Sequence, residues 1–156
     1  MSTIDIDTTA LHAFNPSTRL PSGITVPPST IHLLDNFFRV VDSLPSEPTN
    51  SQKFTSIFTS DGTWKTPDAA FRGHDQLAQS GTSWEFLRML KSFQHHVGKI
   101  YALDAEGKDL MVWGNILMQT VDGEKHDVVY SAKADIEVDA RGEARLAFFQ
   151  GWSSRV

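Results

Sequence analysis

The spacing of apolar residues changes once along this chain, near residue 94. Before that point apolar side chains recur every three or four residues, which is the repeat of an amphipathic helix. The repeat is clearest over residues 29–44, where Ile31, Leu34, Phe38 and Val41 share one face. Apolar residues also flank this face, so the pattern predicts a long and largely buried first helix, which the proline that follows it ends.

Two weaker helical patterns follow, over residues 51–58 and over residues 73–93, with a break near Gly81. A short strand is expected at residues 63–66. From residue 94 onward apolar and polar residues alternate, which is typical of strands. Glycine-containing turns divide this part into four strands, expected at residues 95–103, 110–121, 127–138 and 144–152. Helices followed by a run of hairpins predict an α+β fold, with the helices packed on one face of an antiparallel sheet.

The predicted strand over residues 110–121 is apolar in both of its registers. One register includes Val112 and Ile116, and the other includes Trp113 and Leu117. A strand that is apolar on both sides needs a cover on both faces of its sheet. Because the helices cover only one face, a second copy of the chain is expected on the other, as a homodimer through the sheet.

Composition narrows the class of protein. The 156 residues are enough for one domain with a single core. We expect residues 1–28, which are rich in proline, serine and threonine, to form a flexible N-terminal tail and residues 29–156 to form the domain. A net charge of −5 with scattered basic residues argues against a nucleic acid partner. The absence of cysteine excludes disulfides and thiolate chemistry. No leader peptide or membrane-spanning run is recognised, so a cytoplasmic protein is expected.

Four local patterns together resemble the nuclear transport factor 2-like superfamily, in its SnoaL-like branch, over roughly residues 29–152. The first helix is followed by the segment from Phe54 to Trp64, and a glycine-led segment from Phe71 to Leu77 comes next. The segment from Phe93 to Val97 contains His95 and His96, and Asp135 precedes a glycine turn and the last strand. The resemblance implies a cone-shaped α+β barrel, with three N-terminal helices packed on a strongly curved antiparallel sheet. It also implies frequent dimers and a function in either cofactor-free catalysis or ligand binding.

The resemblance carries over only some of the family's acid and base positions. Ketosteroid isomerases of this fold have an aspartate before a proline on the first short strand, where this chain has Thr66. Scytalone dehydratase has two strand histidines. His95 resembles the first, but no histidine stands near Asn115 to match the second. Asp135 resembles the acid/base aspartate of the SnoaL cyclases.

Two orientations are left open by the alternation of strand residues. His95 and His96 point to opposite faces, so only one of them can face a pocket. Asp135 alternates with Ala134 and Ile136, which places it outside, whereas the resemblance places it inside. Either histidine could transfer protons near neutral pH, and an aspartate in an apolar pocket would have a raised pKa and could serve as an acid. Exposed or purely structural roles are the alternatives for all three.

Other residues are candidates for contacts with a substrate. Tyr130 could donate a hydrogen bond to a developing oxyanion. Aromatic and polar side chains could line a cavity for a flat apolar ligand, although ordinary core packing or surface exposure would also explain them. These candidates are Trp64, Thr66, Trp84, Trp113, Asn115, Phe148 and Arg39. No His-x-His or Glu-x-x-His spacing suggests a metal site, and no cofactor is expected.

The sequence therefore predicts a cofactor-free isomerase, dehydratase or cyclase that acts by proton transfer on a hydrophobic, polyketide- or terpenoid-like molecule. In this hypothesis the catalytic residues are His95 or His96, Asp135 and Tyr130. The alternative is a non-catalytic protein of the same fold that binds a small ligand or serves as a dimerising scaffold. A fold alone does not separate the two functions.

Overall fold

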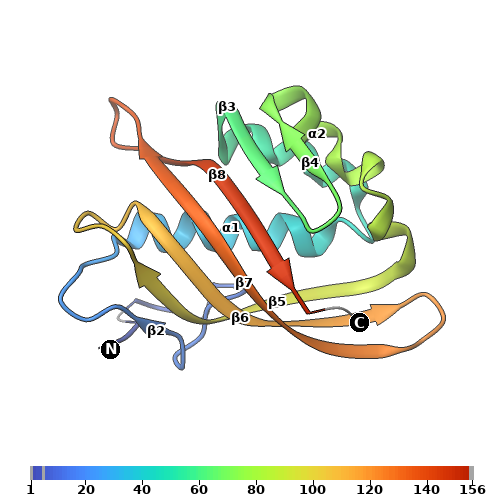
Figure 1. The fold of residues 1–156 in the computed structure, drawn as a ribbon, viewed down its shortest axis with the longest axis horizontal. Helices are drawn as coiled ribbons and strands as arrows, with labels where there is room; N and C mark the ends of the chain where they lie inside the picture. The colour runs from blue at the N-terminus through green and yellow to red at the C-terminus, as the bar shows by residue number, and fades with distance from the viewer. Residues whose placement is uncertain (1, 5, 155–156) are drawn as a thin grey trace.

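The computed structural model describes residues 2–4 and 6–154 and shows an α+β architecture of helices packed against one mixed sheet (Figure 1). The helices are α1 (Pro28–Ser43) and α2 (Gly73–Ser83), with two 3-10 helices, η1 (Pro48–Ser56) and η2 (Glu85–Met89). The strands are β1 (Ser2–Thr3), β2 (Arg19–Leu20), β3 (Phe58–Lys65), β4 (Ala70–Arg72), β5 (Leu90–Ala102), β6 (Asp109–Thr120), β7 (Lys125–Val138) and β8 (Ala144–Ser153).

The eight strands form one sheet in the order β1-β2-β5-β6-β7-β8-β3-β4. The four long strands β5 to β8 are joined by hairpins into an antiparallel meander, which confirms the four strands expected from the alternation. At the far edge β3 pairs with β8 in parallel, and β4 folds back on β3. The edge strands β1 and β4 do not pair with each other, so the sheet is open and the expected barrel is not closed.

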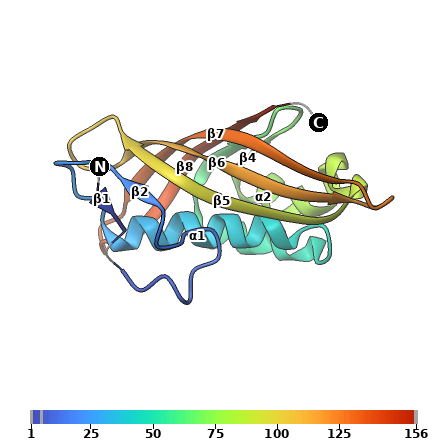
Figure 2. The same cartoon turned by 90° about the horizontal axis from the view of Figure 1, so that it is seen from below.

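Helix α1 lies along one face of the long strands (Figure 2). It begins with Pro28 in its first turn, where a proline removes no intrahelical hydrogen bond. Its wide apolar face is buried as predicted, and Phe37 and Phe38 at its centre pack against Phe149 of β8, with ring centroids 4.2 and 5.8 Å apart. The core therefore lies between α1 and the inner face of the sheet.

The region expected to be helical up to residue 93 ends earlier. Helix α2 stops at Ser83, because Trp84 has an extended backbone (φ −81°, ψ 101°). Strand β5 already begins at Leu90, and its pairing with β6 shifts register between Leu90 and Ser92. The shift turns both Leu90 and Phe93 inward although they are three residues apart. The register shift in β5 therefore produces the same three-residue spacing of apolar side chains as a helix. The short helix expected over residues 51–58 is the 3-10 helix η1.

The segment before α1 lies against the domain. It contains the short strands β1 and β2, and Ala13 and Phe14 are buried. The amide of Val97 in β5 donates to the carbonyl of Ala13 at 2.9 Å, and the Thr18 hydroxyl donates to the carbonyl of Val97 at 2.8 Å. The apolar residues Ala13 and Phe14 of this segment are thus buried against the domain. The domain boundary at residue 28 stays a prediction.

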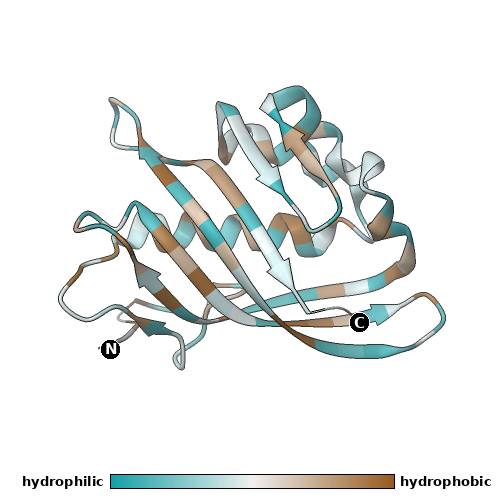
Figure 3. Ribbon diagram, viewed as in Figure 1, coloured by the Kyte–Doolittle hydropathy of each residue, from teal (hydrophilic) through white to brown (hydrophobic). Residues whose placement is uncertain are grey.

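The outer face of the meander carries apolar side chains, and the colouring of Figure 3 shows apolar positions along these strands. Trp113 and Leu117 of β6 and Val129 of β7 are 49%, 44% and 52% exposed. The register predicted to face away from the helices therefore has no cover within the described part of the chain. Among the same residues, no helix has both the length and the apolar character that crossing a membrane requires.

Candidate functional site

A cavity of about 400 Å³ lies between the C-terminal half of α1 and the inner face of the sheet. Its volume falls in the range of small-molecule sites, roughly 300–1,000 Å³. Its walls are mainly aromatic, and the rings include Phe37, Trp64, Trp84, Phe93, Tyr130 and Phe149. Such walls favour a flat apolar ligand. One imidazole, that of His95, also lines this cavity.

His95 projects from the inward register of β5 and is only 8% exposed. Its ring stacks on Phe38 at a centroid distance of 5.0 Å and meets the edges of Phe93 and Tyr130 at 4.7 and 5.2 Å. Its Nδ1 atom lies 2.5 Å from Oδ1 of Asp42. Because a carboxylate accepts hydrogen bonds, the neutral ring carries its hydrogen on Nδ1. The lone pair is then on Nε2, which has no hydrogen-bond partner among the described residues.

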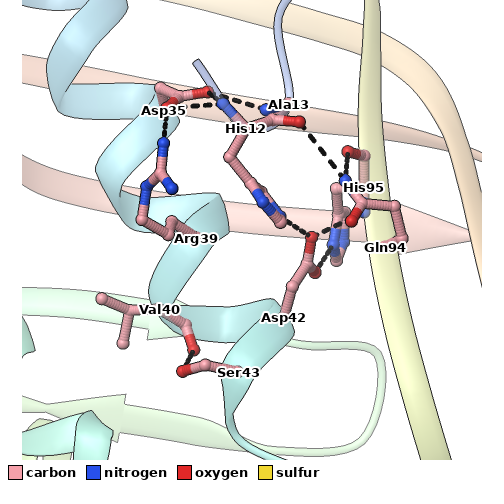
Figure 4. Close-up of polar contacts among 9 residues, drawn as sticks. All are labelled: His12, Ala13, Asp35, Arg39, Val40, Asp42, Ser43, Gln94 and His95. Atoms are coloured by element: carbon pink, nitrogen blue, oxygen red, sulfur yellow. Dashed lines mark hydrogen bonds and ion pairs between the residues drawn. The ribbon is translucent and has the colours of Figure 1, made fainter. Parts of the chain in front are cut away.

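Asp42 lies in the last turn of α1, and its side chain is almost completely buried (Figure 4). Besides the His95 ring, it accepts a hydrogen bond from the His95 backbone amide at 2.8 Å, and Nε2 of His12 lies 2.6 Å from Oδ2. Burial alone would raise the pKa of Asp42. The positive charge that His95 carries when its ring is protonated and the hydrogen bonds from both histidines outweigh burial, so the pKa of Asp42 is lowered and the carboxylate stays ionised.

Tyr130 of β7 places its hydroxyl beside this pair. The hydroxyl oxygen is buried and has no hydrogen-bond partner among the described residues. Burial, followed by the negative charge of Asp42, raises the pKa of Tyr130 well above its usual range. The hydroxyl therefore stays protonated, and no described residue accepts its hydrogen.

The mouth of the cavity is more polar than its walls. The Thr66 hydroxyl and the indole N–H of Trp84 both donate to Oδ1 of Asp68, at 2.9 and 3.1 Å. Ser153 and Ser154 also border the opening. An apolar interior with one base, one donor and a polar rim can bind a small molecule and transfer a proton to or from it. Within the described residues, no group of three or more His, Asp or Glu side chains is arranged to hold a metal ion.

The sequence matches no protein-family model and no curated protein at a significant level. Solved structures do match. An NTF2-like protein of unknown function from Exiguobacterium sp. 255-15 has a TM-score of 0.58 and 14% identity, over 80% of this chain and 99% of that one. A hexachlorocyclohexane dehydrochlorinase, LinA type 2, has a TM-score of 0.64 and 12% identity, over 81% and 84%. ActVI-ORFA from Streptomyces coelicolor has a TM-score of 0.60 and 12% identity, over 82% of this chain and 96% of that one.

This chain has the NTF2-like fold. Identities of 12–14% show the fold and nothing finer. The cavity lies between the helices and the sheet of this fold.

Five candidates from the sequence line the cavity of the NTF2-like fold: His95, Tyr130, Trp64, Thr66 and Trp84. The remaining candidates do not. His96 and Asn115 are paired on β5 and β6 and are half-buried, outside the cavity lining, and Asn115 donates to Asp127 at 3.0 Å. Strand alternation thus places His95 inside and His96 outside.

Asp135 is half-buried outside the cavity and forms an ion pair with Lys133. Its neighbours Ala134 and Ile136 are buried, so the alternation of the strand described its orientation and the family pattern did not. Three further candidates are also outside the cavity. Trp113 is exposed, Phe148 lies beneath the Lys65 ammonium at 5.8 Å, and Arg39 donates to the carbonyl of Ala10 at 2.8 Å.

Two residues of the site were not singled out from the sequence. Asp42 had a recognisable signal, since it is a carboxylate next to Val41 within the wide apolar face of the first helix. A buried charge normally requires a partner, so the position of Asp42 indicates that a hydrogen-bond donor or a cation lies nearby. His12 had no such signal, because it lies in an irregular segment whose path follows from tertiary contacts.

Proposed function

We propose that this protein is a cofactor-free enzyme of the lyase or isomerase type, in which His95 acts as the general base on an apolar small molecule. The observation that supports the proposal is the pair formed by His95 and Asp42. The carboxylate fixes the Nδ1–H tautomer, so the unpartnered Nε2 atom of a neutral imidazole is available inside an apolar cavity. Positioned proton transfer of this kind contributes about 10²–10⁴-fold to a rate.

In the proposed step, Nε2 of His95 takes a proton from a carbon atom of the substrate. The electron pair of that C–H bond forms a carbon–carbon double bond. In an elimination, a leaving group departs from the neighbouring carbon with its bonding electrons. In an isomerisation, an enolate forms and the imidazolium returns the proton to another carbon. The charge of Asp42 stabilises the imidazolium in both cases, and the Tyr130 hydroxyl can donate to a developing oxyanion.

The aromatic walls favour a flat, hydrophobic substrate, and we propose a polyketide- or terpenoid-like compound in keeping with the SnoaL-like resemblance. The name of one solved neighbour, a hexachlorocyclohexane dehydrochlorinase, supports elimination chemistry on an apolar small molecule. The rival proposal is a binding protein of the same fold, in which the cavity holds a ligand without changing it.

We also propose that two copies of the chain pair through the outer face of the meander. Trp113, Leu117 and Val129 form an exposed apolar surface there, on the side of the sheet opposite α1. A homodimer would cover this surface on both copies at once.

The test is the elimination reaction of 5-nitrobenzisoxazole, a flat aromatic probe. A base removes its C–H proton, its N–O bond breaks and a coloured nitrophenolate forms. We expect the wild-type protein to catalyse the reaction with saturation kinetics, and we expect His95→Gln to lower kcat by about 10²-fold or more.

His96→Gln is the matched control, because it changes the adjacent residue of the same strand, outside the cavity lining. It should leave kcat unchanged. Equal rates for the two variants, or no saturable wild-type turnover, would refute the role of His95. Binding of the probe without turnover would favour the binding protein.

A further inference from the structure

The N-terminal segment brings a second histidine to the buried carboxylate of the site. Asp35, on the same side of α1 as Asp42 and two turns before it, accepts the backbone N–H groups of His12 and Ala13 at 2.7–3.0 Å. Arg39, between the two aspartates, donates to the carbonyl of Ala10 at 2.8 Å. This side of α1 therefore fixes the backbone on both sides of His12, and Figure 4 shows the contacts of Asp35 with His12 and Ala13.

Asp42 thus lies between two imidazoles. Nε2 of His12 is 2.6 Å from Oδ2, and Nδ1 of His95 is 2.5 Å from Oδ1. The side chain of His12 is 20% exposed, whereas that of His95 is 10% exposed and enclosed by aromatic rings. His12 can be reached by solvent, and His95 faces the cavity.

The two histidines compete for the same negative charge. One imidazolium beside Asp42 is stabilised by the carboxylate, but a second is repelled by the first across the same group. Because the side chain of His12 is more exposed than that of His95, a positive charge on His12 costs less desolvation.

We propose that His12 is a positioning residue that keeps His95 unprotonated, and therefore active as a base, below neutral pH. The proposal rests on the function proposed for His95 and extends it to the regulation of that site. Protonated His12 neutralises Asp42, so that His95 loses the charge that would otherwise favour its own protonation. The N-terminal segment would then set the acid limit of activity.

Charged and titratable groups of α1 and β7 also lie near the pair. Asp35 and Arg39 of α1 form an ion pair at 3.3 Å and contact the backbone of the N-terminal segment. Tyr130 of β7 approaches from the cavity side and stays neutral, because its pKa is raised. His12 is therefore the group near Asp42 whose charge changes together with that of His95.

The experiment follows the His95 imidazole by NMR during a pH titration of the full chain, in the wild type and in two variants. His12→Gln keeps an N–H donor for Asp42 but cannot be charged. It should raise the pH at which His95 titrates by about one unit. His12→Lys keeps a positive charge at every pH and should return the midpoint to the wild-type value or below.

His32→Gln is the control, because it removes an exposed histidine from α1, the helix that carries Asp42. It should leave the titration of His95 unchanged. A midpoint that stays at the wild-type value in His12→Gln, or that moves in the same direction in both His12 variants, would overturn the proposal. The second outcome would mean that His12 matters only for structure.

The titration does not require a substrate, so it separates this inference from the proposed function. With the benzisoxazole probe, the acid limb of the kcat/KM profile should move upward by the same amount in His12→Gln, which makes this variant about 10-fold slower at acid pH. A shifted His95 titration without any probe turnover would refute the proposed function and leave the coupling of the histidines intact.

Discussion

The rings of His95 and Tyr130 meet edge to face inside the cavity, with centroids 5.2 Å apart and planes at 79°. The tyrosine hydroxyl is buried without a hydrogen-bond partner among the described residues. A buried hydroxyl without a partner destabilises a fold, because its hydration is lost and nothing replaces it. Retaining such a group beside a candidate base favours a role in binding the substrate.

Tyr130→Phe tests this role, because it removes only the hydroxyl. The free energy of unfolding should rise by about 1 kcal/mol, since an unsatisfied polar group is removed. The kcat for the benzisoxazole probe should fall by about 10-fold or more, since the donor to the developing phenolate is lost. Thermal denaturation and steady-state kinetics measure the two effects. A variant that loses stability and keeps full activity would contradict both expectations.

Asp42→Asn tests the orientation of His95. Asp42 accepts hydrogen bonds with both of its carboxylate oxygens, whereas an asparagine must turn its NH₂ group toward one of these donors. The His95 ring then loses its fixed tautomer, and its protonated form loses a charged partner. We expect kcat for the probe to fall by about 10²-fold and the protein to be less stable by about 1–3 kcal/mol.

Asp68→Asn is a suitable control for Asp42→Asn, because Asp68 is a carboxylate at the mouth of the same cavity and does not contact His95. Activity that falls equally in the two variants would show that negative charge near the cavity matters, rather than the pairing of Asp42 with His95.

The lowered pKa of Asp42 also predicts how stability changes with pH. A carboxyl group whose pKa is lower in the folded state stabilises the fold above its unfolded value, near 3.8, and this contribution is lost as the pH falls through the folded value. The stability difference between the wild type and Asp42→Asn should therefore shrink below pH 3.8. Urea unfolding at a series of pH values measures it, and a difference that stays constant into strong acid would contradict the assignment.

Strand alternation was the most informative part of the sequence for both fold and site. It predicted the meander, placed His95 and His96 on opposite faces and left Asp135 outside. It did not predict the start of β5, because a register shift turned Leu90 and Phe93 to the same side. The family resemblance pointed to His95, which lines the cavity, and to Asp135, which lies outside the lining, and the catalytic roles of both stay predictions.

The partner of His95 could not be found by local patterns. Asp42 and His95 are 53 residues apart, and they meet because α1 crosses the inner face of β5. His12 joins them through contacts between an irregular segment and Asp35, which leave no periodic signature in the sequence. Pairings of this kind follow from the packing of the whole domain.

The exposed outer face gives a prediction about assembly. Trp113 and Leu117 lie in the outward register of β6 with Asn115 between them, and Val129 of β7 is paired with Asn115. Large apolar side chains gathered on one sheet face are unusual for a surface that contacts only water.

If a second copy covers this face, a charge in its centre will be desolvated without a partner and will oppose association. Trp113→Glu should therefore convert a dimer into a monomer, as measured by light scattering after size-exclusion chromatography. Val121→Glu introduces the same charge at an exposed apolar position beyond the end of β6 and should leave the dimer intact. A wild-type protein that is monomeric at micromolar concentration, or a Trp113→Glu variant that remains dimeric, would show that this face is not the interface.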